Sequence, residues 1–298
     1  MGKRSAASRR LQRAVAYPLE AVAAVLMYSF FAILPMDAAS AIGGWLGRTI
    51  GPRLGITRRA RVNMERALPE FDAATREATI KAMWDNAGRT VAELPHLPRI
   101  ARSRIAITGE DHILPFREDG KPCILISGHF SNWELLPQTV AHFGLPCVTV
   151  YRAANNPLVD AFLRWARRLD DDDLAPKGPR GARRALTALK EGRRLGMLID
   201  QKMNDGIAVP FFGRDAMTAP APAQLALREN CPMIPTRLER LEGCHFRVTF
   251  FAPLEMPATG DRKQDVAILM RTVNALFEDW ITERPDQWLW LHRRWPDS

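Results

Sequence analysis

The longest uncharged stretch in the first part of the chain lies close to its beginning. Residues 21–36 (AVAAVLMYSFFAILPM) form a run of 16 residues without a charge. As a helix it would span roughly 24 Å, less than the hydrocarbon core of about 30 Å. Three structures fit: a signal peptide with small residues at 39–41, a transmembrane helix, or an anchor in the membrane interface. We predict an uncleaved anchor helix, with the spanning and interfacial forms both open.

Beyond this run, helical and strand-like patterns alternate. Residues 57–97 read as charged helix, with one helix starting near residue 72 and stopped by Pro95 and Pro98. Short apolar runs predict buried strands at 123–127, 147–151, 195–199, 233–238 and 246–251. Amphipathic patterns predict helices at 157–169, 181–191, 220–229 and 265–283. This alternation predicts an α/β fold with a mostly parallel sheet flanked by helices, divided into a basic anchor segment (1–45) and a main domain (46–298).

Composition and charge narrow the class of protein. A hydrophobic content of 47% over 298 residues argues against a disordered chain and against a multi-span membrane protein. Lys and Arg number 42 against 33 acidic residues, a net charge of +9, and 35 of the 42 are Arg. Such a surface suits phosphates of nucleic acid, lipid head groups or cofactors, although an Arg-rich chain can also reflect genomic base composition. Five basic residues precede the apolar run and six follow it up to residue 66, so charge sets no orientation and suits a helix lying on one anionic leaflet.

The cysteines and histidines predict no metal site and no disulfide framework. The four cysteines have no C-x-x-C spacing, and most of them lie in apolar strand-like runs. We expect them to pack in the core, in a reducing compartment. The six histidines are dispersed without metal-ligand spacing, and no cofactor is predicted.

The candidate chemistry follows the strand at 123–127, in the sequence Ser127-Gly128-His129-Phe130-Ser131-Asn132-Trp133-Glu134. In parallel sheets, residues just past a strand's carboxyl end commonly line the site. If Glu134 bonds one ring nitrogen of His129, the other nitrogen is left as a base for a substrate hydroxyl. Alternatively, Ser131 and Glu134 form a capping box, and His129 is a loop residue. Pro137 complicates both readings, because it would start or kink a helix.

Several blocks together give a more specific signal. Besides GHFSNWE at 128–134 they are Tyr151-Arg152 with Asn155-Asn156-Pro157-Leu158, Arg167, Asp200-Gln201, Pro210-Phe211-Phe212-Gly213, the stretch Arg61-Val62-Asn63 before Leu68-Pro69-Glu70, and QWLWLHRRW at 287–295. In this order they resemble the late (secondary) acyltransferases of lipid A biosynthesis, within the lysophospholipid acyltransferase superfamily. The similarity spans the chain, including the basic anchor.

The resemblance implies an acyltransferase without cofactor. It would move an acyl chain from a thioester, usually of acyl carrier protein, to a hydroxyl of a glycolipid at the cytoplasmic face of the inner membrane. His129 would take the hydroxyl proton, and Glu134 would orient the His129 ring and stabilise its charge. Arg152 or backbone amides would stabilise the developing oxyanion. The remaining implied substrate-binding or site-shaping residues are Asn156, Arg167, Asp200 and, through its phosphate-binding context in Gly178-Pro179-Arg180-Gly181, Arg180. Trp288 and Trp290 would close the core, with Arg293 and Arg294 facing phosphates or solvent.

Departures from the family pattern leave alternatives. The acidic run at 170–173 replaces a Gly-containing connection, and residues 178–181 lack the acid-Gly-Thr core of glycerolipid acyltransferases. Glu134, where those enzymes have Asp, favours the lipid A branch. One alternative is transfer from acyl-CoA to another glycolipid; the other is a non-enzymatic basic peripheral membrane protein. The arginines are scattered and no binding motif accompanies them, so nucleic acid is not an expected partner.

Overall fold

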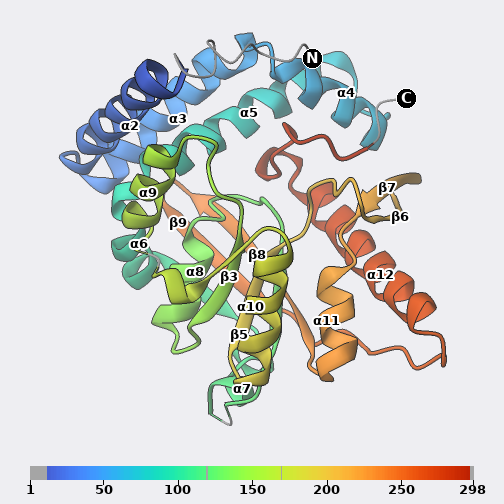
Figure 1. Ribbon diagram of the computed structural model, residues 1–298. Coiled ribbons are helices and arrows are strands. Elements are labelled where there is room, and N and C mark those ends of the chain that lie inside the picture. Colours follow the sequence, from blue (N-terminus) through green and yellow to red (C-terminus); the bar gives the residue numbers. More distant parts are fainter. Residues whose placement is uncertain (1–11, 119, 169, 296–298) are drawn as a thin grey trace.

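A seven-stranded sheet forms the centre of the protein, with helices on both faces (Figure 1). The computed structural model describes residues 12–118, 120–168 and 170–295. The strand order across the sheet is β1-β9-β8-β2-β5-β3-β4, and β6 and β7 form a separate two-stranded hairpin. The strands are β1 (Ile105–Thr108), β2 (Ile124–Ser127), β3 (Cys147–Tyr151), β4 (Leu174–Pro176), β5 (Arg194–Leu198), β6 (Ile207–Phe211), β7 (Arg214–Thr218), β8 (Met233–Glu242) and β9 (His245–Phe250).

The sheet is parallel except at one pair of strands. β4, β3, β5, β2 and β8 run in the same direction, and the antiparallel pairing of β8 with β9 reverses the far edge. β1 then pairs parallel to β9. The predicted α/β class with a mostly parallel sheet is therefore confirmed, and all five predicted strands are present within a few residues.

Four strands have no counterpart in the predicted pattern. β1 and β4 are only 4 and 3 residues long, too short for a periodicity to stand out. The β6–β7 hairpin carries Pro210 and the charged residues Arg214 and Asp215, which read as loop.

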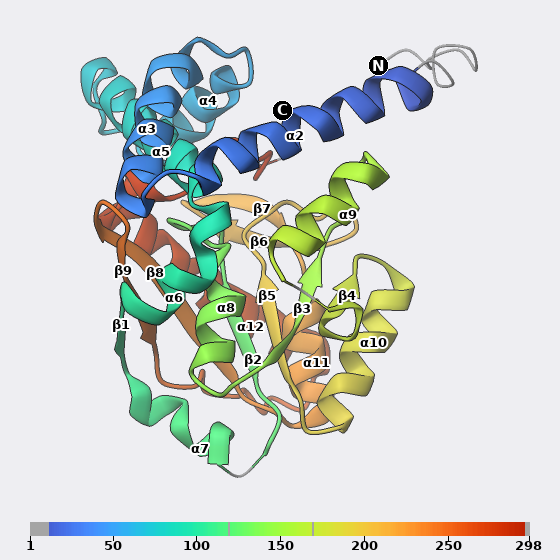
Figure 2. The same ribbon diagram turned by 90° about the vertical axis from the view of Figure 1, so that its left-hand side faces the viewer.

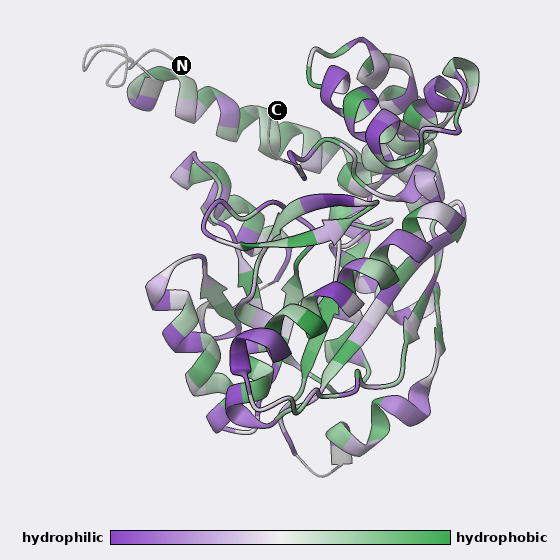
Figure 3. Cartoon of the chain, turned by 90° about the vertical axis from the view of Figure 1, so that its right-hand side faces the viewer, coloured by the Kyte–Doolittle hydropathy of each residue, from purple (hydrophilic) through white to green (hydrophobic). Residues whose placement is uncertain are grey.

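The core lies in two layers, one on each face of the sheet. All of β2 is buried: Ile124 and Ile126 point into the layer under α10, α11 and α12, and Leu125 into the layer under α6 and α8. Burial on both faces explains why this strand is a continuous apolar run. In Figure 3, hydrophobic residues follow the strands behind the amphipathic α12. The helices of the main domain are α4 (Thr57–Ala67), α5 (Ala73–Ala92), α6 (Leu97–Ser103), α7 (Leu114–Glu118), α8 (Leu135–His142), α9 (Pro157–Ala166), α10 (Pro179–Lys190), α11 (Ala221–Glu229) and α12 (Arg262–Glu283).

The predicted core role of the cysteines is confirmed, since all four are buried and free. Burial raises the pKa of the Cys147 thiol to about 12 and that of Cys231 to about 11. These thiols stay protonated at neutral pH and behave as small apolar groups.

Most of the amino-terminal apolar run lies in one helix, α2, and the run ends where the next helix begins. α2 (Tyr17–Ala32) ends before a bend, and Pro35 precedes α3 (Met36–Ile50), so the domain boundary expected at residue 45 falls inside α3. The helical stretch Arg13–Ala32 is long and apolar enough to cross a membrane, and almost none of it is buried. In Figure 2 it runs above the sheet with α9 beneath it.

The α3 helix packs closely against α5 of the main domain, and this contact ties α2 and α3 to that domain. A Cβ on Gly47 would lie 2.0 Å from the carbonyl oxygen of Trp84, and one on Gly88 would lie 2.1 Å from the carbonyl oxygen of Gly43. Real Cβ atoms do not approach backbone this closely, so the helices can cross at this distance only because both carry glycine. α5 in turn carries side chains that reach the candidate site.

We therefore expect Gly47→Val to force the two helices apart and to destabilise the protein by about 1–3 kcal/mol. Urea unfolding of the detergent-solubilised protein measures this change. Gly55→Ala is the matched control, because a Cβ there meets nothing within 4 Å. Equal unfolding midpoints for Gly47→Val and Gly55→Ala would show that the α3–α5 contact is not tight in solution.

Candidate active site

Two neighbouring parallel strands bring a histidine and a carboxylate to one edge of the sheet. His129 follows β2 and Asp200 follows β5, and these strands pair in register up to Ser127 and Leu198. Gly128 lets the turn pass Asp200, because a Cβ there would lie 3.1 Å from the Cβ and Cγ atoms of that residue. The register and this glycine together place the imidazole against the Asp200 carboxylate.

Asp200 receives three N–H groups. Its Oδ1 lies 2.7 Å from His129 Nδ1, and its Oδ2 accepts from the His129 backbone amide at 2.9 Å and from Trp288 Nε1 at 2.8 Å. Burial alone would raise the pKa of Asp200, but the charge and hydrogen bonds of His129 outweigh burial and hold it below its usual range. An ionised Asp200 keeps the proton of a neutral imidazole on Nδ1, so Nε2 is the basic nitrogen.

This arrangement differs from the predicted His129–Glu134 dyad. Both Glu134 carboxylate oxygens instead accept from Arg167, whose Nε and Nη2 each lie 2.6 Å away. The helix after the motif starts only at Leu135, and Ser131 has a φ of 52°, so the chain turns Glu134 toward the end of α9. The same geometry excludes the capping box, because Ser131 does not cap α8.

The Glu134–Arg167 pair lies near the imidazole of His129. Among the described residues, neither member of the pair makes a hydrogen bond to that ring. Trp133 packs with its ring centroid 5.2 Å from that of His129 and donates its Nε1–H to Glu134 at 3.2 Å. Burial alone would lower the pKa of Arg167, but the charge and hydrogen bonds of Glu134 raise it above its ordinary value. Arg167 therefore stays positively charged at neutral pH, and Trp133 links the Glu134–Arg167 pair to the imidazole.

A second histidine and an amide complete the site. Gln201 Nε2 lies 3.0 Å from Nε2 of His129 and 3.0 Å from Nε2 of His292, and the two rings have centroids 4.8 Å apart. Burial and the neighbouring His129 lower the pKa of His292 to about 4, so this ring is neutral at pH 7. His292 was not predicted as a site residue, although it stands in the terminal block QWLWLHRRW.

The loop between His129 and Glu134 is held from behind by buried polar groups. The carbonyl of Ser131 accepts from Asn86 Nδ2 at 3.0 Å, and its amide donates to the Gln287 carbonyl at 2.7 Å. Asn132 donates to Glu93 at 2.7 Å, and Glu93 is fully buried in a bidentate ion pair with Arg240. Hydrogen bonds from α5 and from the segment after α12 thus hold Ser131 at its positive φ, and Glu93 holds the next residue, Asn132.

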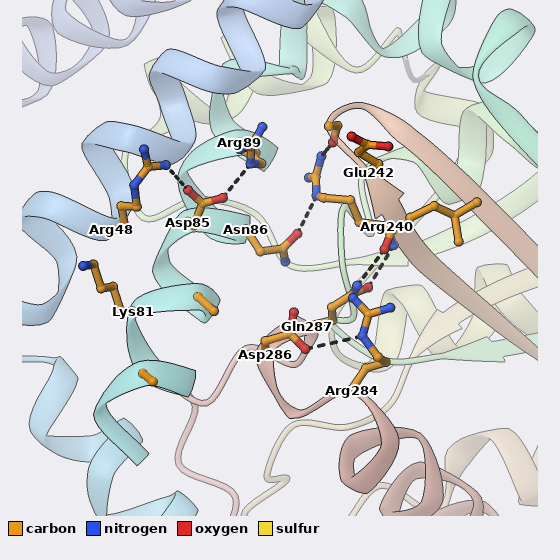
Figure 4. A pocket seen from close by; sticks show the side chains of 14 residues that line it. Arg48, Lys81, Asp85, Asn86, Arg89, Arg240, Glu242, Arg284, Asp286 and Gln287 are labelled. Carbon is orange, nitrogen blue, oxygen red and sulfur yellow. Dashed lines mark hydrogen bonds and ion pairs between the residues drawn. The ribbon is translucent and has the colours of Figure 1, made fainter. Parts of the chain in front are cut away.

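An open cavity of about 420 Å³ lies next to the residues that hold this loop (Figure 4). Asn86 and Gln287, which both bind Ser131, form part of its wall. Across the cavity, Asp85 holds Arg48 and Arg89, so most of its charged lining is paired within the protein.

The other predicted residues occupy three different places. Arg152 and Arg180 are exposed, on the loop after β3 and in the first turn of α10. Asn156 caps α9 through Leu158 and also donates to the Tyr17 carbonyl and Glu20 of α2. Among the described residues, Asn156 therefore joins α9 to α2 and makes no hydrogen bond to His129.

Two predictions for the terminal segment have different outcomes. Trp288 and Trp290 are fully buried in the core, as expected. Arg294 was expected to face phosphates or solvent, but it is fully buried and donates to Thr218 and Asn274. A basic pair at the end of a chain reads as surface, and nothing local reveals that the hairpin β6–β7 and α12 supply acceptors.

Comparison with known sequences decides the family. The family described as bacterial lipid A biosynthesis acyltransferase matches residues 4–297. This chain belongs to that family. It is 26% identical to the lipid A biosynthesis lauroyltransferase of Escherichia coli (strain K12), over 80% of this chain and 79% of that protein. It is 22% identical to a lipid A biosynthesis acyltransferase of Haemophilus influenzae (87% and 82% covered) and 24% identical to the Escherichia coli palmitoleoyltransferase (82% and 83% covered).

The lipid A acyltransferase family confirms the predicted enzyme class. Among solved structures, the 1-acyl-sn-glycerophosphate acyltransferase of Thermotoga maritima shares 12% identity at a TM-score of 0.35, over 78% of this chain and 98% of that one. A score this low does not establish a common fold. In the described residues, no group of three or more His, Cys, Asp or Glu is arranged to hold a metal ion.

We expect Asp200→Asn to lower the acyltransferase rate by roughly 10²–10⁴-fold, because an amide cannot hold the Nδ1 proton as an ionised carboxylate does. Steady-state transfer of a radiolabelled acyl group measures this effect. Asp205→Asn, on an exposed residue five positions on, is the control. A rate for Asp200→Asn equal to that of the control would mean that Asp200 does not orient the base.

His292 gives a prediction for stability against pH. Because its pKa falls from 6.5 in the unfolded chain to about 4 in the folded protein, the unfolded state binds a proton first as the pH drops. Stability contributed by neutral His292 is thus complete above about pH 6.5 and is lost toward pH 4. We expect His292→Gln to reduce the fall in unfolding free energy between pH 7 and pH 4.5 by on the order of 2 kcal/mol. Urea unfolding at both pH values tests this, and parallel curves for the two proteins would contradict it.

Proposed function

We propose that this enzyme transfers a fatty acyl chain from a thioester of acyl carrier protein to a hydroxyl of a lipid A precursor, with His129 as the general base. The observation that carries the proposal is the buried Asp200 carboxylate on Nδ1 of His129, with Nε2 turned to the opposite side. This is the arrangement that deprotonates a hydroxyl, and membership of the lipid A family supplies the class of acceptor.

The chemistry then needs no protein nucleophile. The acceptor hydroxyl gives its proton to His129 Nε2 while its oxygen attacks the thioester carbonyl. Asp200 stabilises the imidazolium that forms. The tetrahedral intermediate expels the thiolate, which takes the proton from Nε2. A thioester is already activated, so a direct transfer suffices.

Glu134 has a changed role in this proposal. It holds Arg167 with both carboxylate oxygens and Trp133 with one, and Trp133 packs on the imidazole. Glu134 therefore acts on the base through the wall of the site, and Asp200 is the carboxylate that orients the ring. Arg152 and Arg180 are exposed, so they can bind the acceptor's phosphates or the acidic carrier protein.

The membrane helix supports a lipid-borne acceptor. Tyr28 of α2 packs against Phe162 and Trp165 of α9, and Asn156 bonds α2 at the other end of the same helix. Along α2 and at the residue after it, seven large apolar side chains are exposed: Leu19, Val22, Val25, Leu26, Met27, Phe30 and Ile33. We place this helix in the cytoplasmic leaflet of the inner membrane, where the acceptor would lie beside the domain.

We expect the full-length protein to acylate a tetra-acylated lipid A precursor with lauroyl-acyl carrier protein in detergent micelles, and His129→Ala to reduce the rate roughly 10²–10⁴-fold. Mass spectrometry of the product measures transfer. His142→Ala, on an exposed histidine at the end of α8, is the control.

Three results would contradict this proposal. A His129→Ala rate equal to that of the control removes the general base. Transfer from acyl-CoA to another glycolipid, without transfer to the lipid A precursor, moves the enzyme to a different acceptor. An unchanged acyl count in lipid A of a deletion strain does the same in the cell.

A further inference from the structure

The basic nitrogen of His129 is covered by the Gln201 side chain, which the reaction described above does not use. Gln201 follows Asp200 directly at the end of β5, so the residue that orients the base and the residue that covers it are adjacent. Its amide nitrogen lies 3.0 Å from Nε2 of both His129 and His292.

The hydrogen positions follow from Asp200. The ionised carboxylate requires N–H at Nδ1 of His129, so Nε2 of the neutral ring is an acceptor. Gln201 must then present its NH₂ group and not its carbonyl oxygen, since an oxygen would face a lone pair. The two N–H bonds of that group point to two imidazole nitrogens, and His292 accepts the second with its own Nε2.

His292 is itself fixed. Its backbone carbonyl accepts from Asn63 Nδ2 at 2.6 Å, and the same amide group donates to the Trp290 carbonyl at 2.8 Å. Its ring is mostly buried and lies against His129. The Gln201 amide is therefore held on one side by an acceptor that stays in place when the other side changes.

We propose that Gln201 is a catalytic residue that donates its amide N–H to the thioester carbonyl oxygen as negative charge develops there, and that His292 is the positioning residue that aims it. This inference rests on the proposed function, because it takes His129 as the base.

The exchange of hydrogen bonds is balanced. The acceptor hydroxyl donates to His129 Nε2 and displaces one Gln201 N–H, while the other stays on His292. The hydroxyl proton passes to Nε2, the new C–O bond forms, and the carbonyl π pair moves onto oxygen, where the freed N–H binds it. When the C=O bond re-forms, the C–S bond breaks and the thiolate takes the proton from His129. Gln201 then returns to Nε2.

The test compares Gln201→Ala and Gln201→Glu with wild type in the lauroyl-acyl carrier protein assay. Losing one oxyanion donor costs roughly 10²–10³-fold in kcat, and we expect this loss with KM nearly unchanged for both substrates. Glu cannot donate when ionised, so it should not restore the rate. Gln224→Ala, on an exposed glutamine of α11, is the control.

An acyl donor with an altered carbonyl group shows whether Gln201 acts by bonding the substrate or only by supporting the structure of the site. An acyl dithioester presents sulfur, a weak hydrogen-bond acceptor, in place of the carbonyl oxygen. The ratio of wild-type to Gln201→Ala rates should shrink by at least about tenfold with this donor, if most of the lost factor belongs to that hydrogen bond.

His292 is tested by rescue. His292→Ala should lower kcat by on the order of tenfold, the value of one neutral hydrogen bond. His292→Gln should recover most of that loss, because its side-chain oxygen can accept at the place of Nε2. Thermal melting of each variant excludes unfolding as the cause.

The outcomes are distinguishable. If His129→Ala is inactive while Gln201→Ala and Gln201→Glu match the Gln224→Ala control, the inference is wrong and the proposed function stands. Equal losses with thioester and dithioester donors, or no rescue by His292→Gln, also overturn it. If wild type does not acylate the lipid A precursor, the proposed function itself fails.

Discussion

One buried carboxylate organises the site. Asp200 is almost fully inaccessible to solvent, and an isolated charge in that position would be costly. Three N–H groups offset that cost, two from His129 after β2 and one from Trp288 near the end of the chain. The carboxylate therefore cannot be satisfied until β2, β5 and the terminal segment are all in place. The site exists only in the completed fold, and the same bonds fix which ring nitrogen of His129 faces Asp200.

The second constraint lies behind the site. Glu93 and Arg240 form a buried ion pair. Ser40 of α3 and Asn132 of the site loop also donate hydrogen bonds to the Glu93 carboxylate. Burying both charges is tolerable because every charged-group atom of Glu93 and Arg240 has at least one hydrogen-bond partner, and removing either residue would leave an uncompensated charge. Through Glu93, at the end of α5, this network joins α3 to the loop that carries His129. The close glycine crossing of α3 and α5 keeps the two ends of that connection in contact.

Sequence reasoning succeeded where periodicity and position suffice. A continuous apolar strand followed by Gly and His predicted that His129 lies past the carboxyl end of a buried strand, and it follows β2. The family blocks named Asp200 and Arg167; Asp200 bonds His129, and the role of both residues in binding substrate stays a prediction. It failed where a long-range partner decides. The sequence separation of His129 and Glu134 suggested a bond between them, but strand register gives the imidazole to Asp200 and the left-handed Ser131 turns Glu134 to Arg167. Arg294 looked like a surface cation because its acceptors lie on the hairpin and on α12.

His292 shows most clearly what a pattern cannot reveal. It lies far from His129 along the chain, in a block whose aromatic residues indicate packing, yet the two rings meet across one amide. The two histidine rings have different surroundings, and these suit them to different roles. His129 has a buried anion on Nδ1 and can accept a proton at Nε2. His292 is mostly buried beside another imidazole and near Arg59, and these lower its pKa to about 4. In the proposed reaction, His292 stays neutral and remains a hydrogen-bond acceptor while His129 takes up the proton, so the Gln201 amide between them stays bound to His292 throughout.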